Sequence, residues 1–137
     1  FFDDDASINP IEIYKQLQIN SPVPFGSFIK YFDKYLACAS PERFILKQEE
    51  KLFSQPIKGT IKRNLINETE DNHLKELLLH SEKERAENLM IVDLVRNDLA
   101  HSSKTGTVKV EELFGIYSFK QVHQMISTVS TQEWEYP

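Results

Sequence analysis

The hydrophobic pattern of this chain changes its period twice, and this change constrains the fold more than any other feature. Short aromatic and β-branched runs separated by polar pairs fill residues 25–53 and are typical of an antiparallel meander. Helical spacing takes over from about residue 70 to 101. Strand-like runs then return at Val108–Val110, Phe114–Tyr117 and Val122–Ser130. The order predicts an α+β fold in which antiparallel β-sheet strands pack with helices.

Two helices are expected from a capping signal and from leucine spacing. Asn9 can cap the first, at about 10–18, and Pro10 suits its first position. Leucines three and four residues apart place the second at about 70–80. Residues 55–68 look irregular, so side chains there are expected in a turn.

A third and longer helix is expected to begin near Ser81, because Glu84 three positions on completes a capping box. It extends to about Leu99 or His101. Its apolar stripe is expected to comprise Ile91, Leu94, Val95 and Leu99. No repeat or linker interrupts the chain, so residues 1–137 are expected to form a single region without an internal boundary.

Composition narrows the class of protein. The 137 residues suffice for one domain with a sizeable core, and a net charge of −5 gives no basic footprint for nucleic acid. No apolar run approaches the ~20 residues of a membrane span, and no signal peptide is visible. Cys38 is the single cysteine, which fits a reducing cytoplasm, and its apolar surroundings predict a buried, inert thiol.

Lys58 is the first candidate for chemistry, because Pro56 and Gly59 punctuate the short segment that carries it. An amine held in such a turn can act as a nucleophile or a base when it is partly desolvated. The alternative is an exposed loop lysine, which for an isolated residue is the commoner case.

Glu84 and Glu87 are the second candidates, because residues three apart share a helix face. Two carboxylates with Asn88 nearby suit a hard cation such as Mg2+, which is typically held by one or two carboxylates and by waters. The alternative is a charged first helical turn that complements the helix dipole.

Glu42 and His123 are weaker candidates. Glu42 follows Pro41 and precedes an apolar run, where a half-buried carboxyl group can act as a general acid or can pair with Arg43 or Arg63. His123 lies in an expected strand beside the core, where a hydrogen-bonded packing role is commoner than catalysis.

Five segments together carry a family resemblance across about residues 25–131. They are Ala39-Ser40-Pro41-Glu42-Arg43-Phe44, Pro56-Ile57-Lys58-Gly59-Thr60, the run from Arg85 to Leu99, Gly106-Thr107-Val108-Lys109-Val110 and the run from Val122 to Val129. In this order they resemble the chorismate-utilising enzymes, and within them component I of the aminodeoxychorismate synthases. The resemblance implies an incomplete piece of the anthranilate-synthase-like chorismate-binding fold.

The resemblance assigns roles to the candidate residues. Lys58 matches a lysine that attacks C2 of chorismate, where anthranilate synthases usually carry alanine. Glu42 matches the general acid that protonates the departing C4 hydroxyl, and His123 matches an active-site histidine that positions or hydrogen-bonds the substrate. Gly59 and Thr60 are expected to shape the substrate pocket.

The resemblance also implies a cofactor and a reaction. Glu87 and Glu84 match acids of a Mg2+ site. The family group converts chorismate and ammonia into 4-amino-4-deoxychorismate, the precursor of p-aminobenzoate and folate, and takes the ammonia from a glutamine amidotransferase subunit or domain. The alternatives within the family are anthranilate synthase component I and an isochorismate or salicylate synthase.

Part of the family pattern has no counterpart in these 137 residues, including a later metal-binding glutamate and a glycine-rich segment. We therefore expect this piece alone to be inactive. Unpaired strand edges of an incomplete sheet invite pairing with another copy. A non-catalytic, self-associating module is thus the alternative from another class.

Overall fold

The computed structural model describes residues 9–132, which divide into two units after Glu42. The first unit holds α1 (Pro10–Asn20), β1 (Phe25–Tyr31) and β2 (Lys34–Ser40). The second holds β3 (Arg43–Gln48), β4 (Lys51–Gln55), β5 (Ile57–Lys62), α2 (Glu68–His80), α3 (Glu82–His101), β6 (Lys109–Ser118) and β7 (Val122–Gln132). Within residues 9–132, no helix has the length and hydropathy that a membrane span requires.

In the first unit, α1 packs on a hairpin formed by β1 and β2. The helix begins as predicted, because Asn9 Oδ1 accepts a hydrogen bond from the Ile11 amide at 3.1 Å. Tyr14 of α1 stacks near Phe28 of β1, with ring centroids 5.5 Å apart. Cys38 in β2 is half-buried, so the prediction of a buried thiol is wrong.

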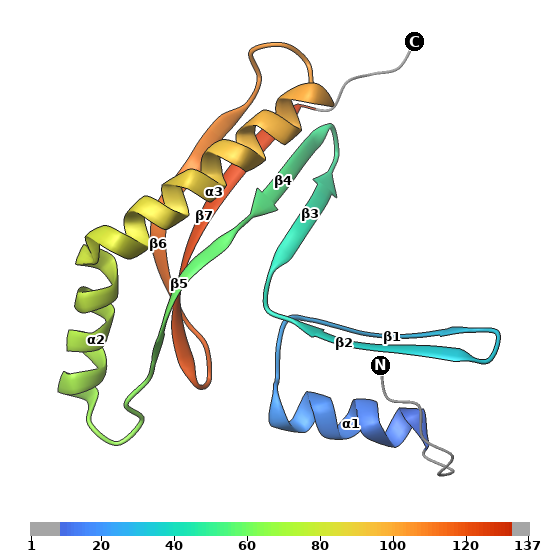
Figure 1. Cartoon of the computed structure of the whole chain (residues 1–137). Coiled ribbons are helices and arrows are strands. Elements are labelled where there is room, and N and C mark those ends of the chain that lie inside the picture. Colours follow the sequence, from blue (N-terminus) through green and yellow to red (C-terminus); the bar gives the residue numbers. More distant parts are fainter. Residues whose placement is uncertain (1–8, 133–137) are drawn as a thin grey trace. The chain divides into compact units, whose positions relative to one another are not determined.

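In the second unit, every strand pairing is antiparallel and β7 lies at the centre (Figure 1). Strand β6 pairs along one edge of β7, while β4 and β5 follow one another along its other edge. Strand β3 pairs with β4 on the outside. The prediction of helices with antiparallel strands is confirmed. Strand β7 pairs with β4, β5 and β6 and so holds the sheet together.

Helices α2 and α3 cover the same face of this sheet. Asp71 of α2 bonds His123, Asn88 of α3 bonds Ser127, and these two β7 residues lie an even number of positions apart. Helix α3 begins after the predicted cap Ser81, whose side chain accepts from the Glu84 amide. Helix α2 begins two residues before its expected start, and the Asn67 side chain caps it by accepting from the Glu70 amide. The apolar core under α3 consists of Val92, Leu99 and Val129, with Val95 and Val108 packed against it.

The predicted apolar stripe of α3 is partly wrong. Leu94 is 56% exposed, whereas Val92 and the polar Asn88 are buried. Hydrophobic periodicity cannot place an asparagine on an inward face, and here Asn88 is drawn inward by hydrogen bonds to the sheet.

The strand predictions need three corrections. The expected meander over 25–53 is split, because the described residues show no pairing of β2 with β3 across Pro41. Residues 57–62, expected to be irregular, form β5. The two short runs expected after Val108 are one strand, β6, that contains two register shifts and a positive φ of 62° at Phe114.

Candidate functional site

A β-bulge in β5 places Lys58 where the sequence predicted a turn. Ile57 pairs with Ile126 and Thr60 pairs with Gln124, so three steps along β5 match two steps along β7. A bulge sets two residues of one strand against a single residue of its partner and so redirects a side chain. Pro56 and Gly59, which look like turn signals, are compatible with this irregular strand, because bulges favour glycine at positive φ.

Both residues of the bulge face α3. The Lys58 side chain reaches Glu87, and a Cβ built on Gly59 would lie 3.2 Å from Glu84 Oε2 and 3.2 Å from Met125 Cβ. Gly59 has a φ of 101°, a conformation that residues with a side chain rarely adopt, and it lies where helix and strand approach closely. Glycine at this position lets the first turn of α3 sit against the bulge.

Two lysines and two carboxylates meet at this contact, and we call Lys58, Lys83, Glu84 and Glu87 the charged cluster. Lys58 Nζ lies 3.1 Å from Glu87 Oε2, with 44% and 34% of the two side chains exposed. Lys83 Nζ lies 3.9 Å from Glu84 Oε1 and 3.9 Å from Glu87 Oε1. Gly59 lies beneath the cluster. The structure therefore brings together four of the predicted site residues, which are Lys58, Gly59, Glu84 and Glu87.

The donors in this cluster suit Mg2+ in part. Glu84 and Glu87 offer hard carboxylate oxygens, and Mg2+ is commonly held by one or two protein carboxylates and otherwise by water and substrate oxygens. Among residues 9–132, no group of three or more His, Cys, Asp and Glu side chains is arranged to hold a metal ion. The pair thus fits one side of a coordination sphere.

Asn88, expected beside the metal, is instead completely buried beneath the cluster. Its Nδ2 donates to the carbonyl oxygens of Lys58 at 3.3 Å and of Met125 at 3.4 Å. Its Oδ1 accepts from Ser127 Oγ at 2.6 Å, and Ser127 Oγ accepts from the Phe114 amide at 3.1 Å. Asn88 and Ser127 thereby connect α3 to three strands.

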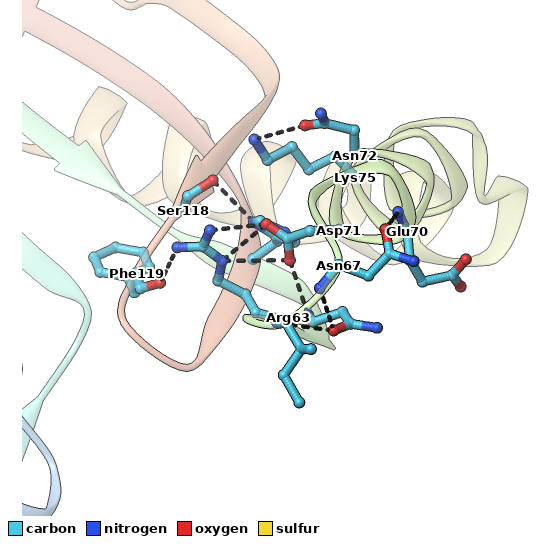
Figure 2. Close-up of polar contacts among 11 residues, drawn as sticks. Arg63, Asn67, Glu70, Asp71, Asn72, Lys75, Ser118 and Phe119 are labelled. Carbon is cyan, nitrogen blue, oxygen red and sulfur yellow. Dashed lines mark hydrogen bonds and ion pairs between the residues drawn. The ribbon is translucent and has the colours of Figure 1, made fainter.

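His123 lies in a second buried network, at the α2 end of the sheet. The imidazole is 0% exposed, with Nδ1 2.9 Å from Ser118 Oγ and Nε2 3.0 Å from Asp71 Oδ1. Arg63 Nη2 donates to Asp71 Oδ2 at 2.8 Å, and Arg63 Nη1 donates to the Phe119 carbonyl (Figure 2). Both ring nitrogens are thus engaged within the chain, which favours the positioning role predicted for His123 over direct contact with substrate.

The electrostatics of this network follow from Arg63. Hydrogen bonds from the Arg63 guanidinium, helped by the Asn64 amide and His123 and opposed by burial, hold the pKa of Asp71 well below its usual range. The same bond raises the pKa of Arg63. The Ser118 hydroxyl, the His123 imidazole and the Asp71 carboxylate are linked in the order found in a catalytic triad. In a triad the carboxylate stabilises the imidazolium, but here the bidentate bonds from Arg63 neutralise the Asp71 carboxylate. Sequence analysis missed Asp71 because it resembles an ordinary acid of a first helical turn.

The remaining two predicted site residues are Glu42 and Thr60. Glu42 belongs to the first unit, where it is exposed and its amide donates to Ser40 Oγ at 3.2 Å, so the expectation of a half-buried carboxyl is wrong. Its suggested partner Arg63 binds Asp71 instead. Thr60 pairs with Gln124, which neighbours His123 in β7, so its side chain lies on the face opposite the helices.

Comparison with known proteins gives a consistent result. The sequence model of a family described as chorismate binding enzyme matches residues 2–133. Aminodeoxychorismate synthase component 1 of Bacillus subtilis is 41% identical over 123 residues, which are 90% of this chain and 26% of the bacterial protein. Anthranilate synthase alpha subunit 1 of Arabidopsis thaliana is 38% identical over 122 residues, which are 89% of this chain and 20% of the plant protein.

The fold has a counterpart among solved structures. Anthranilate synthase component I from Streptococcus pneumoniae matches with a TM-score of 0.78 and 29% identity, over 95% of this chain and 28% of that one. The chain spans about a quarter of the length of the Bacillus subtilis protein, at 26%. The family match runs across both units, and the absence of an internal domain boundary stays a prediction.

Proposed function

Because this chain belongs to the chorismate binding enzymes, we propose that its full-length protein is an aminodeoxychorismate synthase component I, which converts chorismate and ammonia into 4-amino-4-deoxychorismate. The observation that carries the proposal is the position of Lys58. Its amine projects from a bulge and lies 3.1 Å from a glutamate that matches the family's metal ligand. An alanine at this position, as anthranilate synthases usually carry, would leave that space without a nucleophile.

Lys58 supplies covalent catalysis in this proposal. The lone pair of its amine forms a bond to C2 of chorismate, the ring double bonds shift, and the C4–O bond breaks. A proton from Glu42 goes to the departing oxygen, which leaves as water, and the proton that the Lys58 amine loses on bonding returns to Glu42. Ammonia then bonds to C4 and gives up a proton to the Lys58 nitrogen, the double bonds shift back, and the C2–N bond to Lys58 breaks. One difficult substitution thereby becomes two easier steps.

The other residues bind and orient the substrate. Glu84 and Glu87 would hold Mg2+, whose charge offsets that of the substrate's ring carboxylate. Gly59 shapes the pocket by letting the first turn of α3 sit against the bulge, and Thr60 contributes backbone to the pocket wall. His123 fixes the strand on which this wall depends, through its bonds to Asp71 and Ser118.

The partners follow from the proposed reaction. Ammonia comes from a glutamine amidotransferase subunit or domain, and free ammonium can replace it. The product leads to p-aminobenzoate and folate, and we place the protein in the cytoplasm. Self-association of the 137-residue piece, through the unpaired edges of its sheet, is a property of the piece alone.

Product analysis of the full-length protein tests the proposal. With chorismate, Mg2+ and ammonium, we expect 4-amino-4-deoxychorismate, and mass spectrometry should find a substrate-derived adduct on the peptide that contains Lys58. Lys58→Ala should abolish both the adduct and amination, whereas Lys62→Ala, an exposed lysine of the same strand, should leave both intact. Anthranilate or an isochorismate as the product, or an adduct that survives Lys58→Ala, would refute the proposal.

A further inference from the structure

We propose that Asn88 and Ser127 are positioning residues that fix the bulge carrying Lys58 and so set where its amine meets Glu87. The proposal deepens the proposed function, and its kinetic part rests on that function. Its structural part concerns only the second unit and can be tested without any substrate.

The bulge needs support from outside the strand ladder. The register shift between Ile57 and Thr60 interrupts the pairing with β7, so the carbonyl of Lys58 lies at the irregular position. A backbone carbonyl that is shielded from water requires a hydrogen-bond donor, and the Lys58 carbonyl is part-buried. Asn88 Nδ2 provides one at 3.3 Å, from a side chain that is itself fully buried.

The hydrogen bonds fix the orientation of the Asn88 amide. The Phe114 amide can only donate, so Ser127 Oγ accepts from it and sends its own proton to Asn88 Oδ1. That bond, at 2.6 Å, leaves the Nδ2 group facing the carbonyls of Lys58 and Met125, which can only accept. The four hydrogen bonds are therefore all satisfied by a single orientation of the Asn88 amide.

Helix α3 consequently holds Lys58 at two points. Glu87 contacts the amine at the end of the side chain, and the next residue, Asn88, holds the backbone carbonyl. Without the second contact the bulge can shift relative to the helix while the rest of β5 stays paired. A displacement of about 1 Å at a reacting group can cost on the order of 100-fold in rate.

Ser127→Ala in the full-length protein tests the structural part. It leaves Asn88 in place but removes the donor to Oδ1, so we expect roughly tenfold faster amide hydrogen exchange in peptides that span residues 57–60. Ser130→Ala is the matched control, since Ser130 lies in the same strand, is also buried, and donates to Glu111 instead. Ser127→Thr, which keeps a hydroxyl, should restore slow exchange.

The kinetic part uses the same variants. In Ser127→Ala we expect kcat for amination to fall about tenfold and KM for chorismate to stay within about twofold of wild type. The hydrogen bond lost from Ser127 fixes Asn88, which in turn fixes the bulge that carries the attacking amine. Ser130→Ala should keep kcat.

The outcomes separate the two proposals. Unchanged exchange at 57–60 in folded Ser127→Ala would overturn the positioning role, as would faster exchange with an unchanged kcat. A wild-type product other than 4-amino-4-deoxychorismate would instead end the proposed function and leave the exchange result standing.

Discussion

At residue scale, Gly59 decides how closely helix α3 approaches the sheet. Its φ of 101° suits glycine, and an added Cβ would meet Glu84 and Met125 at 3.2 Å. Gly106 has a similar backbone, with a φ of 78°, but an added Cβ there would meet nothing within 4 Å. The two glycines thus separate backbone strain from steric crowding.

We expect Gly59→Ala to destabilise the protein more than Gly106→Ala does. The positive φ alone should cost about 1–2 kcal/mol in the free energy of unfolding of either variant. Crowding against Glu84 and Met125 adds to this cost at Gly59 only. Urea unfolding of both variants measures the difference, and equal losses would mean that the helix simply moves aside.

The sequence predicts which residues belong to the candidate site better than it predicts the burial and orientation of their side chains. Lys58, Glu84 and Glu87 were recognised by motif, and the structure brings them together. The burial of Asn88 was not predictable, because an asparagine next to a charged turn is ordinarily exposed and its partners lie 30 or more positions away. The resemblance places Thr60 in the substrate pocket together with Gly59, but the bulge sends the Thr60 side chain to the face opposite the helices.

At the scale of elements, Asp71 fastens α2 to the sheet. Arg63 just beyond β5 and His123 in β7 both bond its carboxylate, and the Asn64 amide donates to it at 2.9 Å. The carboxylate is nearly buried, so the network depends on its charge.

We expect Asp71→Asn to remove part of the acid sensitivity of folding. The folded pKa of Asp71 is depressed, so its stabilisation is fully present above the unfolded value of about 3.9 and is lost as pH falls below it, toward the folded pKa. The variant should be less stable at pH 7 and should lose less stability between about pH 4 and pH 2. Urea midpoints across this range measure the effect, with Glu70→Gln, an exposed acid of the same helical turn, as the control. Parallel curves for Asp71→Asn and wild type would contradict it.

Helices could be predicted from sequence more closely than strands. Asn9 and Ser81 are local capping signals, and α1 and α3 begin next to them. Strand β5 was missed because Pro56 and Gly59 are also the residues that make turns. Its strand character comes from pairing with β7, sixty or more residues later in the chain, which no local pattern contains.

At the scale of the whole molecule, the described residues would supply only one side of the proposed Mg2+ site. Two carboxylates project from α3, and lysines 58 and 83 neutralise them. Mg2+ favours octahedral coordination and gives up its waters reluctantly, so two ligands hold it weakly.

We therefore expect Mg2+ to bind more weakly to the 137-residue chain than to the full-length protein, and the chain alone to consume no chorismate. In the full-length protein Glu87→Gln should weaken Mg2+ binding by at least about tenfold. Isothermal titration calorimetry measures the Mg2+ affinity of the chain, of the full-length protein and of Glu87→Gln, and an assay of chorismate consumption checks the activity of the chain. Glu82→Gln, which changes an exposed acid at the start of α3, is the control for Glu87→Gln. Equal affinity in chain and full-length protein, or an unchanged titration with Glu87→Gln, would contradict the assignment.

The extra residue in β5 has a consequence for charge. Lys58 and Arg63 are an odd number of residues apart, and strict alternation would send their side chains to opposite sides of the sheet. The bulge shifts the phase between them, so the ammonium reaches Glu87 on α3 and the guanidinium reaches Asp71 on α2. One inserted position thereby lets β5 and the residue that follows it give each of two acidic helices its own cation.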